Sequence, residues 1–144
     1  MNASTETHAT PNEESAATVV SSAQSTTANP PLAPEELTVR CLTSEEAFEA
    51  LGEAWEELSH GIPFRRPAWC EAWWRHYREP NAELLILAVE DHAGRLIGLA
   101  PWYQERSLRE GRVIRFLGSG EVCSDYVTLL SQRGGESAVA LSIH

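Results

Sequence analysis

Lysine is absent from this 144-residue sequence, and its 11 basic residues are all arginines, set against 21 acidic residues. The formal net charge is therefore -10 at pH 7. A protein that binds the phosphate backbone of DNA or RNA needs a basic surface, and this charge balance does not provide one. We therefore expect no nucleic-acid partner.

Cysteine and metal-binding patterns are also scarce. The cysteines are widely spaced and form no C-x-x-C pair (Cys41, Cys70 and Cys123). Neither a disulfide framework nor a zinc site is indicated, and buried free thiols are the expected state. Three histidines show no metal-ligand spacing among themselves (His60, His76 and His92). We predict no metal site, and the absence of a G-x-S-x-G sequence gives no support to hydrolase chemistry.

Long apolar runs are missing as well. The longest, Leu84 to Val89, has the length of a strand and falls far short of the roughly 20 residues that span a bilayer. Residues 1–34 contain no aromatic residue and show no apolar periodicity, which predicts a disordered tail. The N-terminus also lacks the basic start and apolar stretch of a secretory signal. We expect a cytoplasmic protein without a membrane span.

Aromatic and aliphatic residues become frequent after the tail, where we place one domain over residues 35–133. Alternating apolar residues predict a strand over residues 37–42. Thr43 and Glu46 have capping-box spacing, and apolar residues at helical intervals then predict a helix that runs to about His60 and stops at Gly61. Residues 62–66 are expected to form an extended linker, because Pro63 and Pro67 disfavour helical geometry in the residues before them.

Pro67 suits the first turn of a second helix. That helix carries one broad apolar stripe (Trp69, Cys70, Trp73, Trp74 and Tyr77). Two interpretations stay open for its tryptophans: they wedge the helix onto a sheet, which the pattern favours, or one of them, such as Trp73, lines a ligand groove.

The second half of the domain is strand-like. We predict a hairpin of residues 84–89 and 96–103, with Gly98 and Pro101 marking a bulge or an unpaired edge position. Strands over residues 112–117 and 126–130 follow, and residues 134–144 begin a further helix that the end of the sequence cuts short. This order predicts an α+β fold, with a mixed, mostly antiparallel sheet and two N-terminal helices packed on it.

Several stretches together resemble one known family. They are Pro63-Phe64 with Pro67-Ala68-Trp69 and Trp73-Trp74, the segment Leu96 to Tyr103, and Leu117-Gly118-Ser119-Gly120 with Ser124-Asp125-Tyr126. In this order and spacing, residues 35–133 resemble the CelD/BcsL-type acetyltransferases of the GNAT superfamily, which are associated with cellulose biosynthesis.

The resemblance implies a GNAT-like fold and transfer of an acyl group from acetyl-CoA or another acyl-CoA to an amine. It also implies a protein about twice as long, whose second half carries the catalytic groups. This chain would then be the N-terminal, non-catalytic half, incomplete at its C-terminus, and would not bind the coenzyme strongly by itself. The alternatives are a non-catalytic protein-binding module, whose partner is the separately encoded half or another chain, and an inactive fragment.

Arg115 to Gly120 formally fits the R/Q-x-x-G-x-G/A loop with which GNAT enzymes hold the coenzyme pyrophosphate, so the cofactor candidates are Arg115, Gly118 and Gly120. Such a loop works when it opens a helix whose N-terminus faces the phosphates. Glu121 and the β-branched Val127 and Thr128 argue against a helix there, so an ordinary glycine turn is favoured.

The candidates for acceptor binding are Trp73, Ser124, Asp125 and Tyr126. A carboxylate beside the glycine turn, such as that of Asp125, could orient an amine substrate, or it could simply form an Asx-turn, which the pattern favours. No catalytic residue can be assigned from the sequence.

Overall fold

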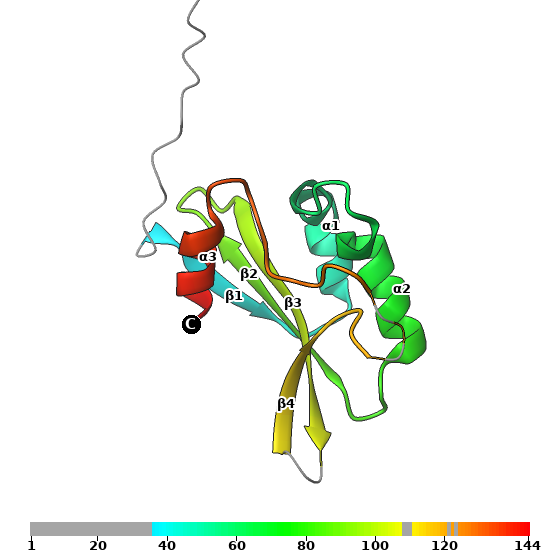
Figure 1. The fold of residues 1–144 in the computed structure, drawn as a ribbon. Coiled ribbons are helices and arrows are strands. Elements are labelled where there is room, and N and C mark those ends of the chain that lie inside the picture. The colour runs from blue at the N-terminus through cyan, green and yellow to red at the C-terminus, as the bar shows by residue number, and fades with distance from the viewer. Residues whose placement is uncertain (1–35, 108–110, 121, 123) are drawn as a thin grey trace, which may run out of the picture.

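The computed structural model describes residues 36–107, 111–120, 122 and 124–144, and the predicted tail, residues 1–34, lies outside the described residues. One antiparallel sheet carries helices on both of its faces (Figure 1). Strands β1 to β4 follow one another in the sheet in chain order, and the short β5 pairs with β3. The predicted α+β fold with a mostly antiparallel sheet is confirmed, and every described strand pair is antiparallel.

The first strand, β1 (Thr38–Leu42), leads into helix α1 (Glu46–Leu58). The predicted capping box is wrong, because the N-cap is Glu45, which makes no side-chain cap, and Glu46 is hydrogen-bonded to the side chain of Ser44. The helix ends two residues before the predicted His60. His60 and Gly61 have φ angles of 51° and 74°, a left-handed conformation that a helix cannot continue through.

A single 3-10 turn, η2 (Pro63–Arg65), occupies the segment that we expected to be extended. The two prolines hold only Ile62 and Arg66 in extended geometry, so the residues between them are free to turn. Helix α2 (Pro67–Tyr77) then starts at Pro67 as predicted. Its residues Cys70, Trp73 and Trp74 are buried, whereas Tyr77 at the end of the stripe is 55% exposed.

Strands β2 (Glu83–Glu90), β3 (Leu96–Ser107) and β4 (Gly111–Phe116) form the predicted meander. Alternate residues of β2 and β3 face α1 and α2 and form the main core with them (Leu84, Ile86, Ala88, Leu99 and Tyr103). A smaller core on the opposite face joins Val89 and Ile97 to Val139 of helix α3 (Glu136–Ile143). The sheet therefore has an α1/α2 face and an α3 face, as the ribbon shows (Figure 1).

Gly98 and Pro101 mark irregularities of β3, as predicted. Val89 pairs with Gly98 and Glu90 with Leu96, so Ile97 is the extra residue of a β-bulge. Pro101 accepts a hydrogen bond from the Leu117 N–H at 2.8 Å. Because the N and O of one residue point to the same side of a strand, the missing N–H of Pro101 faces the gap between β4 and β5, where no ladder bond is lost.

The predicted strand over residues 126–130 is wrong. Strand β5 contains only Leu130–Ser131, and Tyr126 has a φ angle of 62°, which no strand residue adopts. The helix predicted from residue 134 is present as α3. No helix in the described part of the chain has the length and apolar character needed to cross a bilayer.

Candidate functional site

A groove of about 260 Å³ opens on the α1/α2 face, where α2 ends before the β3–β4 hairpin does. Tyr103 and Glu105 are alternate residues of β3 and therefore point to the same face, and Arg115 of β4 pairs directly with Tyr103. Because α2 stops at Tyr77, no helix of the described residues covers the far part of this hairpin face. The remaining lining comes from the end of α2 and the glycine turn (Trp73, Tyr77, Glu79, Ser119, Gly120 and Val122).

Aromatic rings form one wall of the groove. The Trp73 and Tyr77 rings are stacked, with centroids 6.3 Å apart, and the Trp73 and Tyr103 centroids lie 5.4 Å apart. Trp73 and Tyr103 are each only 5% exposed, so they form a fixed base, whereas Tyr77 forms the open rim. The indole N–H of Trp73 is buried and has no hydrogen-bond partner among the described residues, and unpaired buried donors are uncommon in folded proteins.

Among the described residues, two carboxylates and one guanidinium supply the charge of the groove. Arg115 Nε lies 2.6 Å from Glu105 Oε1, so these two charges largely offset each other, and Glu79 adds a further negative charge. Burial raises the pKa of Tyr103 above its usual value, and the charges of Glu105 and Glu79 raise it further, against the lowering effects of Ser119 and Arg115. The groove is therefore neutral to negative and suits a cation better than an anion.

The glycine turn at the groove end has a closed, compact shape. Gly118 and Gly120 have φ angles of 88° and 103°, a conformation that favours glycine. A Cβ on Gly118 would lie 2.6 Å from Ser124 Oγ, which itself accepts a hydrogen bond from Trp69 Nε1 at 2.9 Å. Ser124 N also donates to the Gly118 carbonyl at 3.1 Å, which closes the turn.

This turn does not have the surroundings that a coenzyme pyrophosphate needs. Residues 122 and 124–129 form no helix, so no helix N-terminus within the described residues faces the turn. Arg115 is already paired with Glu105, and the charge of Glu79 would repel phosphate oxygens. The described residues of the turn therefore do not fit the pyrophosphate of an acyl-CoA.

The structure brings only some of the predicted site residues together. Trp73, Arg115 and Gly120 line the groove, whereas Gly118 and Ser124 are buried in the turn that supports it. Asp125 and Tyr126 are exposed, and Tyr126 is held by its carbonyl, which accepts a hydrogen bond from Arg65 Nε at 3.0 Å. Neither of these two residues lines the groove.

Sequence reasoning missed several groove residues. Tyr103 and Glu105 lie on the predicted strand and in the turn after it, and their spacing of two gives them a common face. The register opposite Arg115 would have identified them as its neighbours. Glu79 follows the helix end, and no local pattern marks it as a groove residue.

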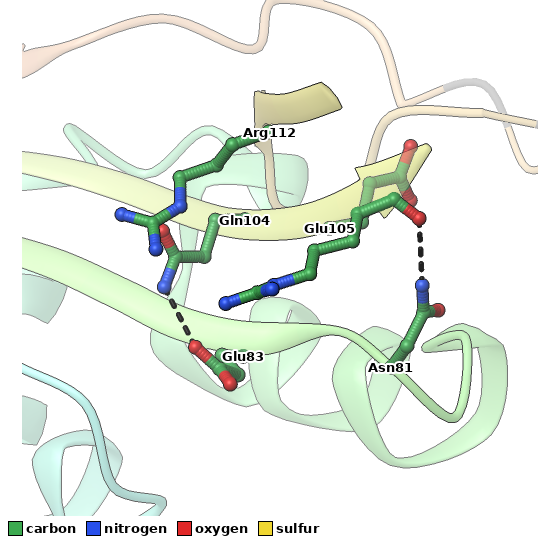
Figure 2. Close-up of a pocket in the computed structure, with 6 residues that line it drawn as sticks. Asn81, Glu83, Gln104, Glu105 and Arg112 are labelled. Carbon is green, nitrogen blue, oxygen red and sulfur yellow. Dashed lines mark hydrogen bonds between the residues drawn. The ribbon is translucent and has the colours of Figure 1, made fainter. Parts of the chain in front are cut away.

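A smaller hollow is a poorer candidate. Figure 2 shows a crevice on the α3 face, where Gln104 Nε2 donates to Glu83 Oε2 at 2.7 Å and Asn81 Nδ2 donates to the Arg106 carbonyl at 2.8 Å. Its volume of about 10 Å³ is comparable to one water-sized probe, which is too small for an organic ligand. Within the part of the chain that the structure describes, no group of three or more ligating side chains could hold a metal ion.

No model of a known protein family matches this chain, and neither does any curated protein or solved structure. What the chain does must therefore be inferred from its own residues, and the groove between α2, β3 and β4 is the candidate site, because it combines aromatic rings with charged side chains.

Proposed function

We propose that this chain is the acceptor-binding half of a GNAT-type N-acyltransferase, similar to the CelD/BcsL-type acetyltransferases, and that its groove holds the amine that receives the acyl group. The single observation that carries this proposal is the combination of stacked aromatic rings with carboxylates in one groove. Supporting it, the order of one strand, two helices and an antiparallel meander agrees with the fold that the resemblance implies.

The groove has the chemistry that an amine acceptor requires. At neutral pH an aliphatic amine is a cation, which the carboxylates of Glu79 and Glu105 attract. The exposed Tyr77 ring adds cation–π attraction worth roughly 0.5–2 kcal/mol, depending on how far the cation is desolvated. The amine must lose a proton before it attacks an acyl carbonyl, and a nearby carboxylate can accept that proton.

The acyl donor lies outside this groove in our proposal, because the glycine turn does not fit an acyl-CoA. A partner that brings the donor, the separately encoded acetyltransferase half or another chain, would approach from the open rim. Tyr77 and Gly120 are exposed at this rim, and no helix of the described residues blocks it. Closing the groove would exclude water from the amine and strengthen every charge interaction in it.

The test compares two probes of similar size and opposite charge, 2-phenylethylamine and 3-phenylpropionate, by NMR of the full chain. We expect the amine to shift the indole signal of Trp73 in a saturable way, and the acid to leave it unchanged. Glu79→Gln should weaken amine binding several-fold, because it removes a carboxylate from the groove without changing its shape. Glu49→Gln is the matched control, since Glu49 is exposed on α1 away from the groove.

Two outcomes would contradict the proposal. Equal binding of the acid and the amine, or no binding of either, would remove the amine site and favour a protein-binding module or an inactive fragment. Micromolar binding of acetyl-CoA that is lost in both Arg115→Ala and Gly120→Ala, and kept in Glu49→Gln, would instead identify the glycine turn as a working cofactor site.

A further inference from the structure

The α3 face of the sheet is apolar and only partly covered. On this face Leu85 of β2 pairs with Trp102 of β3, and Trp102 in turn pairs with Phe116 of β4. All three side chains are partly exposed, and Ile114, two residues before Phe116, is 52% exposed. Helix α3 covers the opposite end of this face, around Val89, and leaves the β3–β4 end open (Figure 1).

Helix α3 has an unpartnered apolar side of its own. It packs closely on the sheet through Val139, because Gly98 beneath it has no side chain. Apart from Glu136 and its serines, the helix is apolar all round, and Leu141 is 63% exposed on its outer side. A helix that is apolar on every side is normally buried on every side.

These two unpartnered surfaces are complementary across a two-fold axis. A two-fold axis parallel to the sheet, and perpendicular to the line that joins these two ends, turns the α3 faces toward each other and places the β3–β4 end of one copy over the α3 end of the other. The outer side of each α3 then meets the open apolar end of the partner sheet, so that two helices fill the layer between two sheets. Dimer formation therefore buries both apolar surfaces together, and the two sheets need no direct contact with each other.

Charges at the two ends are also complementary. Arg106 and Arg112 face each other across β3 and β4, and neither forms an ion pair with a described residue. Like charges placed directly opposite on a sheet destabilise it unless a counter-charge is near. Glu83 lines the same crevice as these two arginines, but it is hydrogen-bonded to Gln104. Glu136, which is exposed in the first turn of α3, has no ion pair among the described residues either.

We propose that the chain forms a two-fold symmetric dimer through the α3 face, in which α3 of each copy packs on the Trp102 and Ile114 end of the other, and Arg106 and Arg112 meet Glu136 of the second copy. This interface lies on the side of the sheet opposite the amine groove. It leaves the groove accessible in both copies and is independent of the proposed function.

Sedimentation velocity of the full chain, over concentrations that extend into the millimolar range, tests the dimer. We expect the mass to double and then to saturate, because a two-fold interface closes on itself. Leu141→Arg and Ile114→Arg should each return the chain to a monomer, since each places a charge in an apolar contact. Tyr77→Arg is the matched control: Tyr77 is 55% exposed on the other face, and its variant should still dimerise.

A charge exchange tests the orientation. Arg112→Glu and Glu136→Arg should each weaken the dimer several-fold, and the double variant should recover most of the loss. Circular dichroism shows whether each variant keeps its fold. A monomer at every concentration, open-ended growth, a dimer unaffected by Leu141→Arg and Ile114→Arg, or no recovery in the double variant would each overturn the proposal.

Discussion

At the scale of single residues, the glycine turn contains two glycines that have similar φ angles and different surroundings. Gly118 and Gly120 both have positive φ angles, but only Gly118 has neighbours where a Cβ would be. Gly120→Ala should cost about 1–2 kcal/mol from the left-handed conformation alone. Gly118→Ala should cost about 1–3 kcal/mol more, because its Cβ would overlap the Ser124 side chain.

Urea unfolding of the two single variants checks this difference. Adding Ser124→Gly to each is the control, since it removes the overlap only in the Gly118 background. Equal losses in the two single variants would mean that the close packing of Gly118 against Ser124 is not present in solution.

Asp91 in the β2–β3 turn makes stability depend on pH. Its carboxylate accepts hydrogen bonds from the N–H groups of Ala93 and Arg95, and from Arg95 Nε. The backbone N–H of Arg95 is the largest cause that holds the pKa of Asp91 below its usual value, followed by the Arg95 side chain. A lowered pKa in the folded state means that this stabilisation is present above the unfolded value and is lost as pH falls through the folded value.

Asp91→Asn should therefore lower the urea midpoint by a constant amount above about pH 5, and the difference should shrink below about pH 4, the ordinary range for aspartate. Urea titrations of both proteins across this range give the measurement. Glu49→Gln serves as the control, because its exposed carboxylate makes none of these bonds. A difference that does not change with pH would show that the Asn variant loses packing and not charge.

At the scale of elements, the sequence predicted the helices and strands whose positions depend on neighbouring residues in the chain. Pro67 sets the start of α2 through its φ angle, and two apolar runs on either side of a polar turn predicted the β2–β3 hairpin. The strand expected over residues 126–130 failed for the opposite reason. Its path is fixed by long-range bonds, from Trp69 to Ser124 and from Arg65 to Tyr126, for which the local sequence has no signal.

The residues of the candidate site also differ in whether a local motif or a long-range contact places them. Trp73 was a candidate for acceptor binding, and Arg115 and Gly120 were candidates for a coenzyme loop, because each belongs to a local motif. All three line the groove. Tyr103 and Glu105 required the register of β3 against β4, and Glu79 required the point at which α2 ends above the hairpin. Asp125 was predicted from its proximity in sequence to the glycine turn, but the chain directs it to the surface.

The docking of α3 depends on one missing side chain. A Cβ on Gly98 would lie 2.4 Å from Val139 Cγ2, so Gly98→Ala should destabilise the fold by about 1–3 kcal/mol through overpacking. Combining it with Val139→Ala should cost less than the sum of the two single changes, with a coupling of about 0.5–3 kcal/mol. A double-mutant cycle from urea unfolding measures this coupling, and additive losses would mean that α3 does not rest on Gly98.

At the scale of the whole molecule, the net charge of -10 acts against the compact state. Several arginines are paired with carboxylates between elements, such as Arg78 with Glu45 and Arg66 with Glu56. These pairs are exposed, and an exposed ion pair contributes only about 0–1 kcal/mol. The repulsion among the remaining carboxylates is spread over the whole surface, and salt screens it at distances beyond about 8–10 Å.

Screening should therefore weaken the repulsion more than it weakens the pairs, because the pairs act at contact distance and the repulsion acts over longer distances. We expect the urea midpoint to rise as sodium chloride is added from low ionic strength to about 0.15 M, where the screening length is about 8 Å. The measurement uses dilute protein, so that dimer formation does not contribute to the urea midpoint. Arg66→Gln, which removes one pair and makes the net charge more negative, should steepen the rise; a midpoint that falls with salt would mean that the ion pairs outweigh the net charge.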